Sequence, residues 1–306
     1  MSGYTRSQLF FSVGKYFKLL RITSWPKNFF IFVPALFAKQ IFDPRDFSLL
    51  VIGFLTFSIA SSAVYVLNDV VDAPNDAVHP LKKDRPIPSG KISAQNAKII
   101  GALLYLILIV ITFSMDRNFM MIVWVYVVIN ILYTAFLKKI VIVDIFCIAS
   151  GFMLRVIGGG LLISVYISKW LILTTLFLSL FLAVMKRRVE IANSTSAIEQ
   201  RKVLQDYSLN FIDQIAAMTG SGVILSYALY SVSERTVGSF GTERLVFTTM
   251  FVIFGIFRYM YLVYKKDRGE NVIEVLMTDI PMIINLLLYV ASAIFIIYFY
   301  KMWIPS

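Results

Sequence analysis

Residues 68–91 read NDVVDAPNDAVHPLKKDRPIPSGK, a polar stretch that directly follows a long apolar segment. Asp69, Asp72 and Asp76 are three and four residues apart, so a helix would place their carboxylates on one face. Clustered carboxylates repel one another unless positive charge lies beside them. The cations that follow in the sequence are His79, Lys82, Lys83 and Arg85.

Two interpretations of this stretch follow from its chemistry. In the first, the bases neutralise the acids directly. In the second, the acids bind a hard divalent cation whose other ligands are phosphate oxygens, while the bases hold the outer oxygens of the same phosphates. The second interpretation predicts a Mg²⁺ site, with Mn²⁺ as an alternative ion, and makes the three aspartates catalytic. Its predicted metal ligands are Asn68, Asp69, Asp72 and Asp76.

The composition predicts an all-α integral membrane protein. Of the 306 residues, 58% are hydrophobic and 15% charged, with a mean hydropathy of +0.77, which excludes an ordinary soluble domain. One polytopic domain over 1–306 is expected, without a cleavable signal peptide. The single Cys147 excludes an intrachain disulfide and makes a metal-thiolate site improbable. Nine apolar stretches long enough to cross a bilayer are predicted at 22–40, 47–67, 97–115, 118–137, 140–163, 168–186, 209–232, 244–264 and 280–303.

The distribution of positive charge predicts the orientation. Most of the 29 lysines and arginines fall on the side of the membrane that holds the N-terminus. Because positive charge collects on the cytoplasmic side, this predicts a multi-pass cell (inner) membrane protein with a cytoplasmic N-terminus. The polar loops at 68–96 and 187–208 would then be cytoplasmic and long enough to form small cap helices over a cytoplasmic mouth. The net charge of +11 indicates contact with anionic membrane lipids rather than nucleic acid.

Several motifs resemble one family. NDVVDAPND (68–76) resembles the NDxxDxxxD motif of the UbiA superfamily of intramembrane prenyltransferases, and YTAFLKK (133–139) resembles its tyrosine-lysine motif. The stretches at 19–38, 79–90, 144–160, 180–190 and 257–282 are similar to the decaprenyl-phosphate phosphoribosyltransferases of that superfamily.

The resemblance carries a set of expectations. It implies a nine-helix bundle with a cytoplasmic catalytic mouth. It also implies Mg²⁺-dependent transfer of 5-phosphoribose from phosphoribosyl pyrophosphate (PRPP) to a polyprenyl phosphate, with release of pyrophosphate. The product would lead to arabinose donors for cell-wall polysaccharide.

The third polar loop favours PRPP over a prenyl diphosphate as the donor. Aromatic prenyltransferases of the superfamily carry a second aspartate motif after span 6, whereas bases dominate here. PRPP brings an extra phosphate, and arginine suits phosphate oxygens, although a basic cluster after a span is also a common topology signal. The residues expected to bind PRPP are His79, Lys82, Lys83, Arg85, Tyr133, Lys138, Asp144, Arg155, Lys186, Arg187, Glu190 and Arg201.

Two charged residues interrupt the fifth predicted span. Asp144 and Arg155 are eleven residues apart, so they share a helix face but are too far apart to pair. Asp144 would orient a ribose hydroxyl or pair with Lys138 or Lys139. Arg155 would face a polar cavity as a substrate ligand or in a structural ion pair. The glycines at 158–160 that follow it predict a close helix contact or a bend.

The acceptor phosphate is expected near the start of the first span. Arg21, Lys27 and Asn28 are the predicted ligands, with a simple positively charged flank as the alternative. The competing functions are an aromatic or quinone-precursor prenyltransferase and, from a different class, a transporter or lipid flippase. Homo-oligomer formation stays open.

Overall fold

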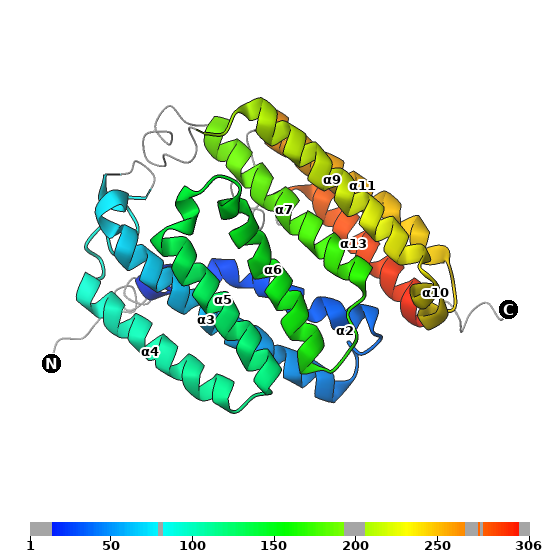
Figure 1. The fold of residues 1–306 in the computed structure, drawn as a ribbon, viewed down its shortest axis with the longest axis horizontal. Helices are drawn as coiled ribbons and strands as arrows, with labels where there is room; N and C mark the ends of the chain where they lie inside the picture. The colour runs from blue at the N-terminus through cyan, green and yellow to red at the C-terminus, as the bar shows by residue number, and fades with distance from the viewer. Residues whose placement is uncertain (1–13, 79–81, 193–205, 267–274, 276–277, 300–306) are drawn as a thin grey trace.

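The computed structural model describes residues 14–78, 82–192, 206–266, 275 and 278–299. Within these ranges the regular elements are helices, which confirms the predicted all-α class (Figure 1). Most are α-helical, while η1, η2 and η4 are 3₁₀-helices and η5 is a π-helix. In chain order they are η1 (Ile22–Phe32), α2 (Val33–Phe37), α3 (Pro44–Ala77), α4 (Ala94–Phe113), α5 (Arg117–Ala135), η2 (Leu137–Lys139), α6 (Val143–Leu162), α7 (Lys169–Ala192), α9 (Leu209–Val232), α10 (Glu234–Phe240), η4 (Arg244–Thr248), α11 (Thr249–Lys266), α13 (Ile280–Ile294) and η5 (Phe295–Phe299).

Eight helical segments of the described chain are long and apolar enough to cross a membrane. Each corresponds to one of the stretches predicted from the sequence, and α9 has the predicted bounds. The remaining predicted span, 22–40, forms η1 and α2, with Pro26 inside the first and Pro34 at the start of the second. A 3₁₀-helix rises about 2.0 Å per residue, so these two elements together reach roughly 30 Å. A count of nine spans stays a prediction.

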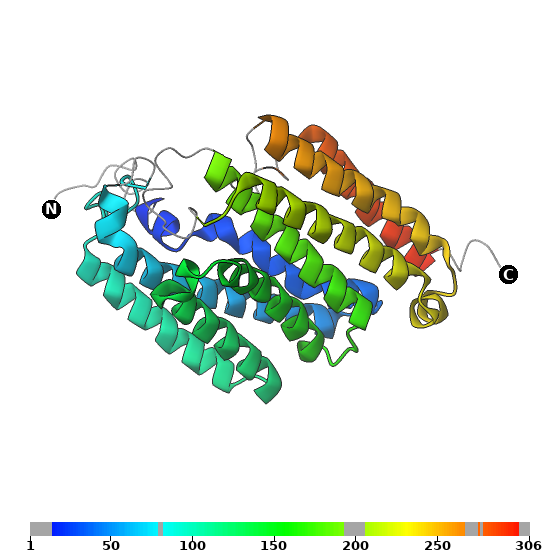
Figure 2. The same cartoon turned by 45° about the horizontal axis from the view of Figure 1, so that its top comes forward.

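Helix α6 occupies the centre of the bundle. It packs against α5, α3, η1 and α2 on one side and against α7 on the other. Figures 1 and 2 show α6 between the helices that precede it in the chain and those that follow it. The apolar core is divided in the same way. One cluster joins α6 to α3 and α5, and a second joins it to α7, α9 and α11. Side chains of α6 therefore meet elements from both halves of the chain.

A glycine allows η1 to approach α6 closely. A Cβ atom at Gly159 would collide with the backbone carbonyl oxygen of Ile31, and one at Gly158 would lie 3.2 Å from the rings of Phe57 and Phe119. Small residues permit this kind of backbone approach. The close helix contact predicted around residues 158–160 is confirmed, and it brings η1 side chains within reach of α6.

Two helices extend further than predicted and correct the polar loops. Residues 68–77 do not begin a loop with its own cap helix but continue α3, which ends at Ala77. The described residues 82–92 form turns. Likewise α7 continues to Ala192 and carries the basic cluster that had been placed at the start of a loop. Residues 193–205 lie outside the described ranges. The polar groups at both places are thus held on helices, whose backbone hydrogen bonds continue beyond the apolar stretch.

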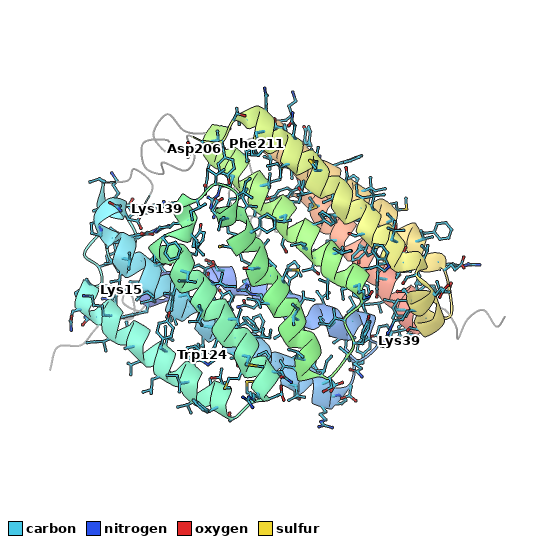
Figure 3. The ribbon with its side chains drawn as sticks, viewed as in Figure 1. Lys15, Lys39, Trp124, Lys139, Asp206 and Phe211 are labelled. Carbon is cyan, nitrogen blue, oxygen red and sulfur yellow. The ribbon has the colours of Figure 1, made fainter. Side chains whose placement is uncertain are left out.

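The sequence motifs lie at one end of the bundle. We call the end with residues 68–78, 137–144 and 186–192 the motif end, and the opposite end, with residues 38–44, 163–169 and 233–244, the far end. Figure 3 shows Lys139 and Asp206 at the motif end and Lys39 at the far end. The motif end holds the sequence motifs, so the candidate site is built there.

Candidate active site

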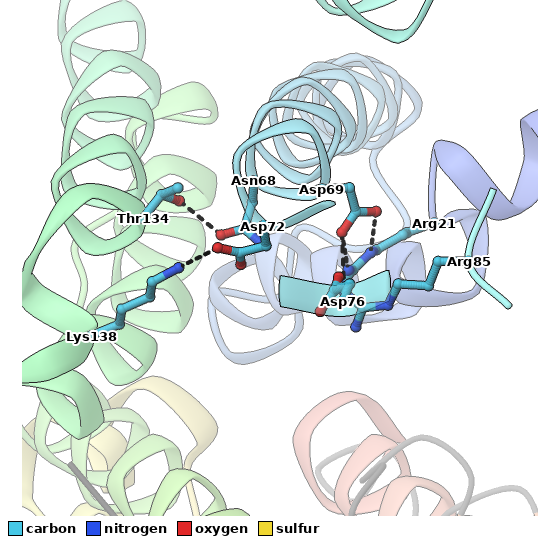
Figure 4. A network of polar contacts seen from close by, with 8 residues as sticks. All are labelled: Arg21, Asn68, Asp69, Asp72, Asp76, Arg85, Thr134 and Lys138. Atoms are coloured by element: carbon cyan, nitrogen blue, oxygen red, sulfur yellow. Dashed lines mark hydrogen bonds and ion pairs between the residues drawn. The ribbon is translucent and has the colours of Figure 1, made fainter. Parts of the chain in front are cut away.

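The last turns of α3 hold the aspartate motif between cations from other elements. Asp69 accepts hydrogen bonds from Arg21 at 2.5 Å and from Arg85 at 3.3 Å, and Asp76 accepts one from Arg85 at 2.6 Å (Figure 4). Asp69 and Asp76 are 3% and 5% exposed. Such buried carboxylates need these partners to offset their lost hydration.

The other two motif residues lie toward α5 and η2. Asp72 accepts a hydrogen bond from Lys138 at 2.8 Å, and the amide oxygen of Asn68 accepts one from Thr134 at 3.1 Å. Figure 4 shows these contacts on the side of α3 away from Arg21. The motif therefore presents two sets of oxygens, one set buried among arginines and the other toward the interior of the bundle.

A cavity of about 410 Å³ opens beside Asn68 and Asp72. Residues from η1, α3, α5, η2, α6 and α7 line it, together with Lys82 and Arg85 from the turns after α3. Cations dominate the charged part of its wall, whose carboxylates are Asp72 and Glu190. The cationic lining residues are Arg21, Lys27, Lys82, Arg85, Lys138, Arg155 and Lys186. A chamber with this excess of positive charge is suited to a ligand that carries several phosphates.

A buried ionic network lies behind the cavity, between α6 and α7. Arg187 donates to Asp144 through Nε at 2.6 Å and to the Tyr133 hydroxyl through Nη2 at 3.1 Å, and its Nη1 donates to Glu190. Arg187 is 1% exposed and Asp144 0%. A buried arginine with two carboxylates is electrically compensated. Arg187 thus braces two groups of the cavity wall, Tyr133 and Glu190.

Tyr207, two residues before α9, completes this network. Its hydroxyl donates to Asp144 at 2.8 Å and accepts the backbone N–H of Ile142 at 2.5 Å. Ile142 has a φ of 70°, a conformation that branched residues rarely adopt. Burial raises the pKa of Tyr207, and the hydrogen bond and charge of Asp144 raise it further, against the lowering effect of the Ile142 N–H. The hydroxyl therefore stays protonated and keeps donating to Asp144.

Arg155 reaches the cavity from the middle of α6 with a different set of partners. Its Nε donates to the amide oxygen of Asn28 at 2.6 Å, Nη1 to the carbonyl of Gly151 at 2.5 Å, and Nη2 to the Tyr126 hydroxyl at 3.3 Å. Every one of these acceptors is neutral. The ion pair considered for Arg155 is not formed with any residue in the described ranges.

The protein oxygens at the cavity supply only part of the ligand set of a divalent cation. Among the described residues, no group of three or more Asp, Glu, His or Cys side chains is arranged to hold a metal, because Asp69 and Asp76 turn to arginines. Asn68 and Asp72 supply two oxygens at the cavity wall. This set fits Mg²⁺, which binds through one or two carboxylates and completes its shell with phosphate and water. Asp69 and Asp76 would join such a site only after exchanging their arginine partners.

The structure brings together most of the residues predicted from the sequence. The predicted residues that line the cavity are Arg21, Lys27, Asn68, Asp72, Lys82, Arg85, Tyr133, Lys138, Arg155, Lys186 and Glu190. Those described outside its wall are Asn28, Asp69, Asp76, Lys83, Asp144 and Arg187. His79 and Arg201 lie outside the described residues.

Two of these residues, Asp144 and Asn28, have partners that differ from the expectation. Asp144 pairs with Arg187 and Tyr207, not with Lys138 or Lys139. Asn28, predicted as a phosphate ligand, is 0% exposed and holds Arg155 instead.

Sequence reasoning missed several aromatic and polar residues of the cavity wall. Tyr65, Tyr126, Asn130 and Thr134 all line it. Asn130 was detectable, because an amide within an apolar span needs a polar partner. The two tyrosines carried no comparable signal, since an aromatic residue in a span is usually part of the core or of the lipid-facing surface.

The comparisons with known proteins agree on one family. A model of the UbiA prenyltransferase family matches residues 28–278. Decaprenyl-phosphate phosphoribosyltransferase from Mycolicibacterium smegmatis is 30% identical, over 71% of this chain and 70% of that protein. The enzyme of the same name from Corynebacterium glutamicum is 29% identical, over 94% and 87%. The solved UbiA homolog from Archaeoglobus fulgidus bound to GPP and Mg²⁺ has a TM-score of 0.71 at 14% identity, over 92% of this chain and 99% of that one.

Proposed function

Because this chain belongs to the UbiA prenyltransferase family and is a transferase, we propose that it transfers 5-phosphoribose from PRPP to a decaprenyl-type polyprenyl phosphate. Pyrophosphate is the second product. Relatives at about 30% identity bear the name of this activity, which supports the proposal beyond the family level.

The positive charge of the cavity wall is the observation that favours PRPP over a prenyl diphosphate as the donor. Seven cationic side chains face two carboxylates on its wall. A prenyl diphosphate bound through metal ions would bring part of its own counter-charge. PRPP and a polyprenyl phosphate together bring a diphosphate and two further phosphates, so they need more protein cations. The absence of a second aspartate motif in the sequence at 186–207 points the same way.

The reaction is a substitution at C1 of the ribose. An oxygen of the acceptor phosphate forms the new bond to C1, and the bond from C1 to the diphosphate breaks with its electron pair leaving on pyrophosphate. The acceptor is already ionised near neutral pH, so the reaction needs no general base. The protein's task is to position two anionic substrates and to stabilise the charge that builds on the leaving group.

The α3 motif is assigned to the leaving group. Asn68 and Asp72 would hold a divalent cation, Mg²⁺ or Mn²⁺, together with the diphosphate oxygens. When bound, this ion neutralises the negative charge that develops on the diphosphate. The solved relative from Archaeoglobus fulgidus, named for GPP and Mg²⁺, supports this assignment at the level of the fold.

A second part of the wall is assigned to the other groups of PRPP. Lys82 and Arg85, from the turns after α3, and Lys186, from α7, lie on the wall and would bind phosphate oxygens. Glu190 and Tyr133, held by Arg187, present groups suited to the ribose hydroxyls. Arg187 and Asp144 act through these two residues.

The chain is a multi-pass membrane protein, and its placement is part of the proposal. The N-terminus and the motif end would face the cytoplasm, where PRPP is soluble, and the polyprenyl chain would lie in the lipid of the inner membrane. The product would lead to polyprenyl-phosphoryl arabinose for cell-wall polysaccharide.

Incubation of the purified protein with labelled PRPP, Mg²⁺ and polyprenyl phosphate tests this function. We expect a labelled lipid together with stoichiometric pyrophosphate, and loss of both on chelation of the metal. Formation of a prenylated ring from geranyl diphosphate and a hydroxybenzoate, without any labelled lipid from PRPP, would instead identify an aromatic prenyltransferase. Lipid movement across the bilayer without pyrophosphate release would identify a transporter or flippase.

A further inference from the structure

Arg155 is a buried cation without a carboxylate partner in the described residues. It is 5% exposed, and its guanidinium hydrogen bonds end on an amide oxygen, a backbone carbonyl and a phenol hydroxyl. The rings of Tyr126, Phe57 and Phe152 lie 4.8, 5.4 and 6.0 Å from its Cζ atom. These contacts satisfy hydrogen-bond donors and add cation–π attraction, but they bring no negative charge.

A buried positive charge with only neutral partners raises the free energy of the folded protein unless an anion neutralises it. Desolvation of a cation inside a protein exceeds what neutral dipoles return, so buried arginines are normally paired. Arg187, on the neighbouring helix, follows that rule with Asp144 and Glu190. Arg155 does not, and it lines the cavity. Its missing counter-ion is therefore a ligand.

The structure holds the guanidinium in place from two sides. Nδ2 of Asn28 donates to Ser58 at 2.9 Å, which leaves the amide oxygen of Asn28 to accept from Arg155. A Cβ atom at Gly151 would lie 3.3 Å from Nη1 of Arg155, so a glycine leaves room for the guanidinium to fold back on its own helix. Preorganisation of this kind lowers the entropy lost when an anion binds.

A second cation and a phenol hydroxyl lie on the wall of the cavity that Arg155 lines. Lys27 and Tyr65 line the same cavity as Arg155. The Arg21 guanidinium also lies over the Tyr65 ring at 4.8 Å. Tyr65 therefore connects the Arg155 pocket with the aspartate motif, where Arg21 pairs with Asp69.

We infer that Arg155, together with Lys27 and Tyr65, binds the phosphate group of the lipid acceptor, and that Asn28 positions Arg155 for this role. The inference rests on the proposed function and divides its cavity into two subsites. The diphosphate of the donor lies beside Asn68 and Asp72, and the phosphate monoester of the lipid lies at Arg155. One oxygen of that monoester then attacks C1 of the ribose as pyrophosphate leaves.

Depth and wall chemistry favour the lipid over the 5-phosphate of PRPP as the ligand. Arg155 lies eleven residues after Asp144, about 16 Å further along α6 from the motif end. The apolar rings of Phe57 and Phe152 lie against it. A lipid phosphate can place its first isoprene unit against such rings while its chain stays in hydrocarbon, whereas a sugar phosphate would bring its hydroxyls against them.

The test uses the full-length protein in detergent and three variants. Arg155→Gln removes the charge, Arg155→Lys keeps the charge without the planar fork, and Asn28→Asp supplies an internal carboxylate to the guanidinium. Arg235→Gln is the control, because Arg235 is an exposed arginine of the far end whose guanidinium stacks on Tyr166 at 3.6 Å. The measurements are KM for polyprenyl phosphate, KM for PRPP, and the melting temperature with added polyprenyl phosphate or neutral polyprenol.

The expected result separates the two substrates. In Arg155→Gln, KM for polyprenyl phosphate should rise about 10- to 100-fold, the worth of a buried hydrogen bond to a charged group, while KM for PRPP changes little. Arg155→Lys should recover part of the loss. Asn28→Asp should raise the acceptor KM without lowering the melting temperature. Polyprenyl phosphate, but not polyprenol, should stabilise the wild type and the control but not Arg155→Gln.

Two outcomes would overturn the inference. A rise in KM for PRPP with an unchanged acceptor KM would assign Arg155 to the donor. A lower melting temperature with both KM values unchanged would make Arg155 a structural brace, and the Asn28→Asp variant decides the point if Arg155→Gln fails to fold.

The melting-temperature arm separates failure of the subsite from failure of the reaction. Phosphate-dependent stabilisation that requires Arg155, in a protein that makes no phosphoribosyl lipid, would leave the subsite standing and reject the reaction. Transfer of phosphoribose to lipid that is unchanged in the Arg155 variants would reject the subsite and leave the reaction standing.

Discussion

Arg155 and Arg187 lie on neighbouring helices and are both buried, at 5% and 1% exposure, yet their surroundings are opposite in charge balance. Arg187 has two carboxylates and lies behind the cavity wall. Arg155 has neutral acceptors and lies on the wall. The difference shows how to separate a structural arginine from a ligand-binding one. Carboxylates of the protein neutralise the structural arginine, whereas the ligand-binding arginine has neutral partners until an anionic substrate binds.

The comparison predicts a division of mutational effects. Changes on the cavity side should lower activity while the protein stays folded. Changes in the buried network should lower the free energy of unfolding first and activity through it.

The largest effect is expected from Asp72→Ala, on the cavity side. Loss of the carboxylate that would hold the divalent cation should reduce turnover on the order of 10³-fold or more. The Asp72–Lys138 pair is partly exposed, at 23% and 19% for the two side chains, so the free energy of unfolding should change by less than about 1 kcal/mol. Initial rates and melting temperatures check both statements, with Glu234→Ala at the far end as a matched loss of one acid. Retained turnover would reject the metal assignment.

Asp144→Ala should give the next largest effect, in stability. It leaves the buried Arg187 with one carboxylate instead of two, and breaking a buried ion pair by removing one partner costs about 3 kcal/mol or more. Denaturant titration in detergent measures the loss. The double variant Asp144→Leu/Arg187→Met should recover most of it, because it removes the charges together. A single variant as stable as the wild type would show that the network is not a brace.

Gly159→Ala tests whether the contact between η1 and α6 holds the acceptor pocket. A Cβ atom there collides with the Ile31 carbonyl, which should cost about 2 kcal/mol of stability and weaken acceptor binding, since Asn28 would withdraw from Arg155. Gly238→Ala is the control, as nothing lies within 4 Å of its Cβ position. Equal melting temperatures and equal acceptor KM values for the two variants would contradict the packing account.

Tyr207→Phe should give the smallest effect, about 1 kcal/mol, through the lost hydrogen bond to Asp144. It should also change the pH dependence. The folded-state pKa of Tyr207 is raised above its ordinary value of 10.0, so above that pH the unfolded chain releases a proton that the folded protein keeps. The stabilisation is thus fully present below about pH 10 and is lost as pH rises further. The variant should show a shallower loss of stability above pH 10, and parallel curves would contradict this.

The sequence predicted the long apolar helices well, because twenty or so apolar residues in a row have few alternatives. Prediction from the sequence failed where a helix continues beyond its apolar residues. Residues 68–77 and 187–192 are polar but continue α3 and α7. Residues 68–77 include Pro74 and several weak helix formers, so tertiary contacts override local propensity there. These contacts include the ion pairs of Asp69, Asp72 and Asp76 with cations of other elements. The 3₁₀ conformation of η1 was not predicted either.

The site was predictable in its residues more than in its pairings. The motif residues Asn68 and Asp72 and the basic residues around them could be selected by type and spacing. The pairings of Arg187 with Asp144 and of Arg155 with Asn28 could not, because these residues are 43 and 127 positions apart in the chain. Both pairings depend on how α6 packs against α7 and η1. The lack of a carboxylate near Arg155 is visible only in three dimensions.

A structure with PRPP, Mg²⁺ and a short-chain polyprenyl phosphate bound tests the central claim most directly. The account predicts the diphosphate and the ion beside Asn68 and Asp72, and the lipid phosphate within hydrogen-bond distance of the Arg155 guanidinium. A 5-phosphate of PRPP on Arg155, with the lipid phosphate elsewhere, would contradict it.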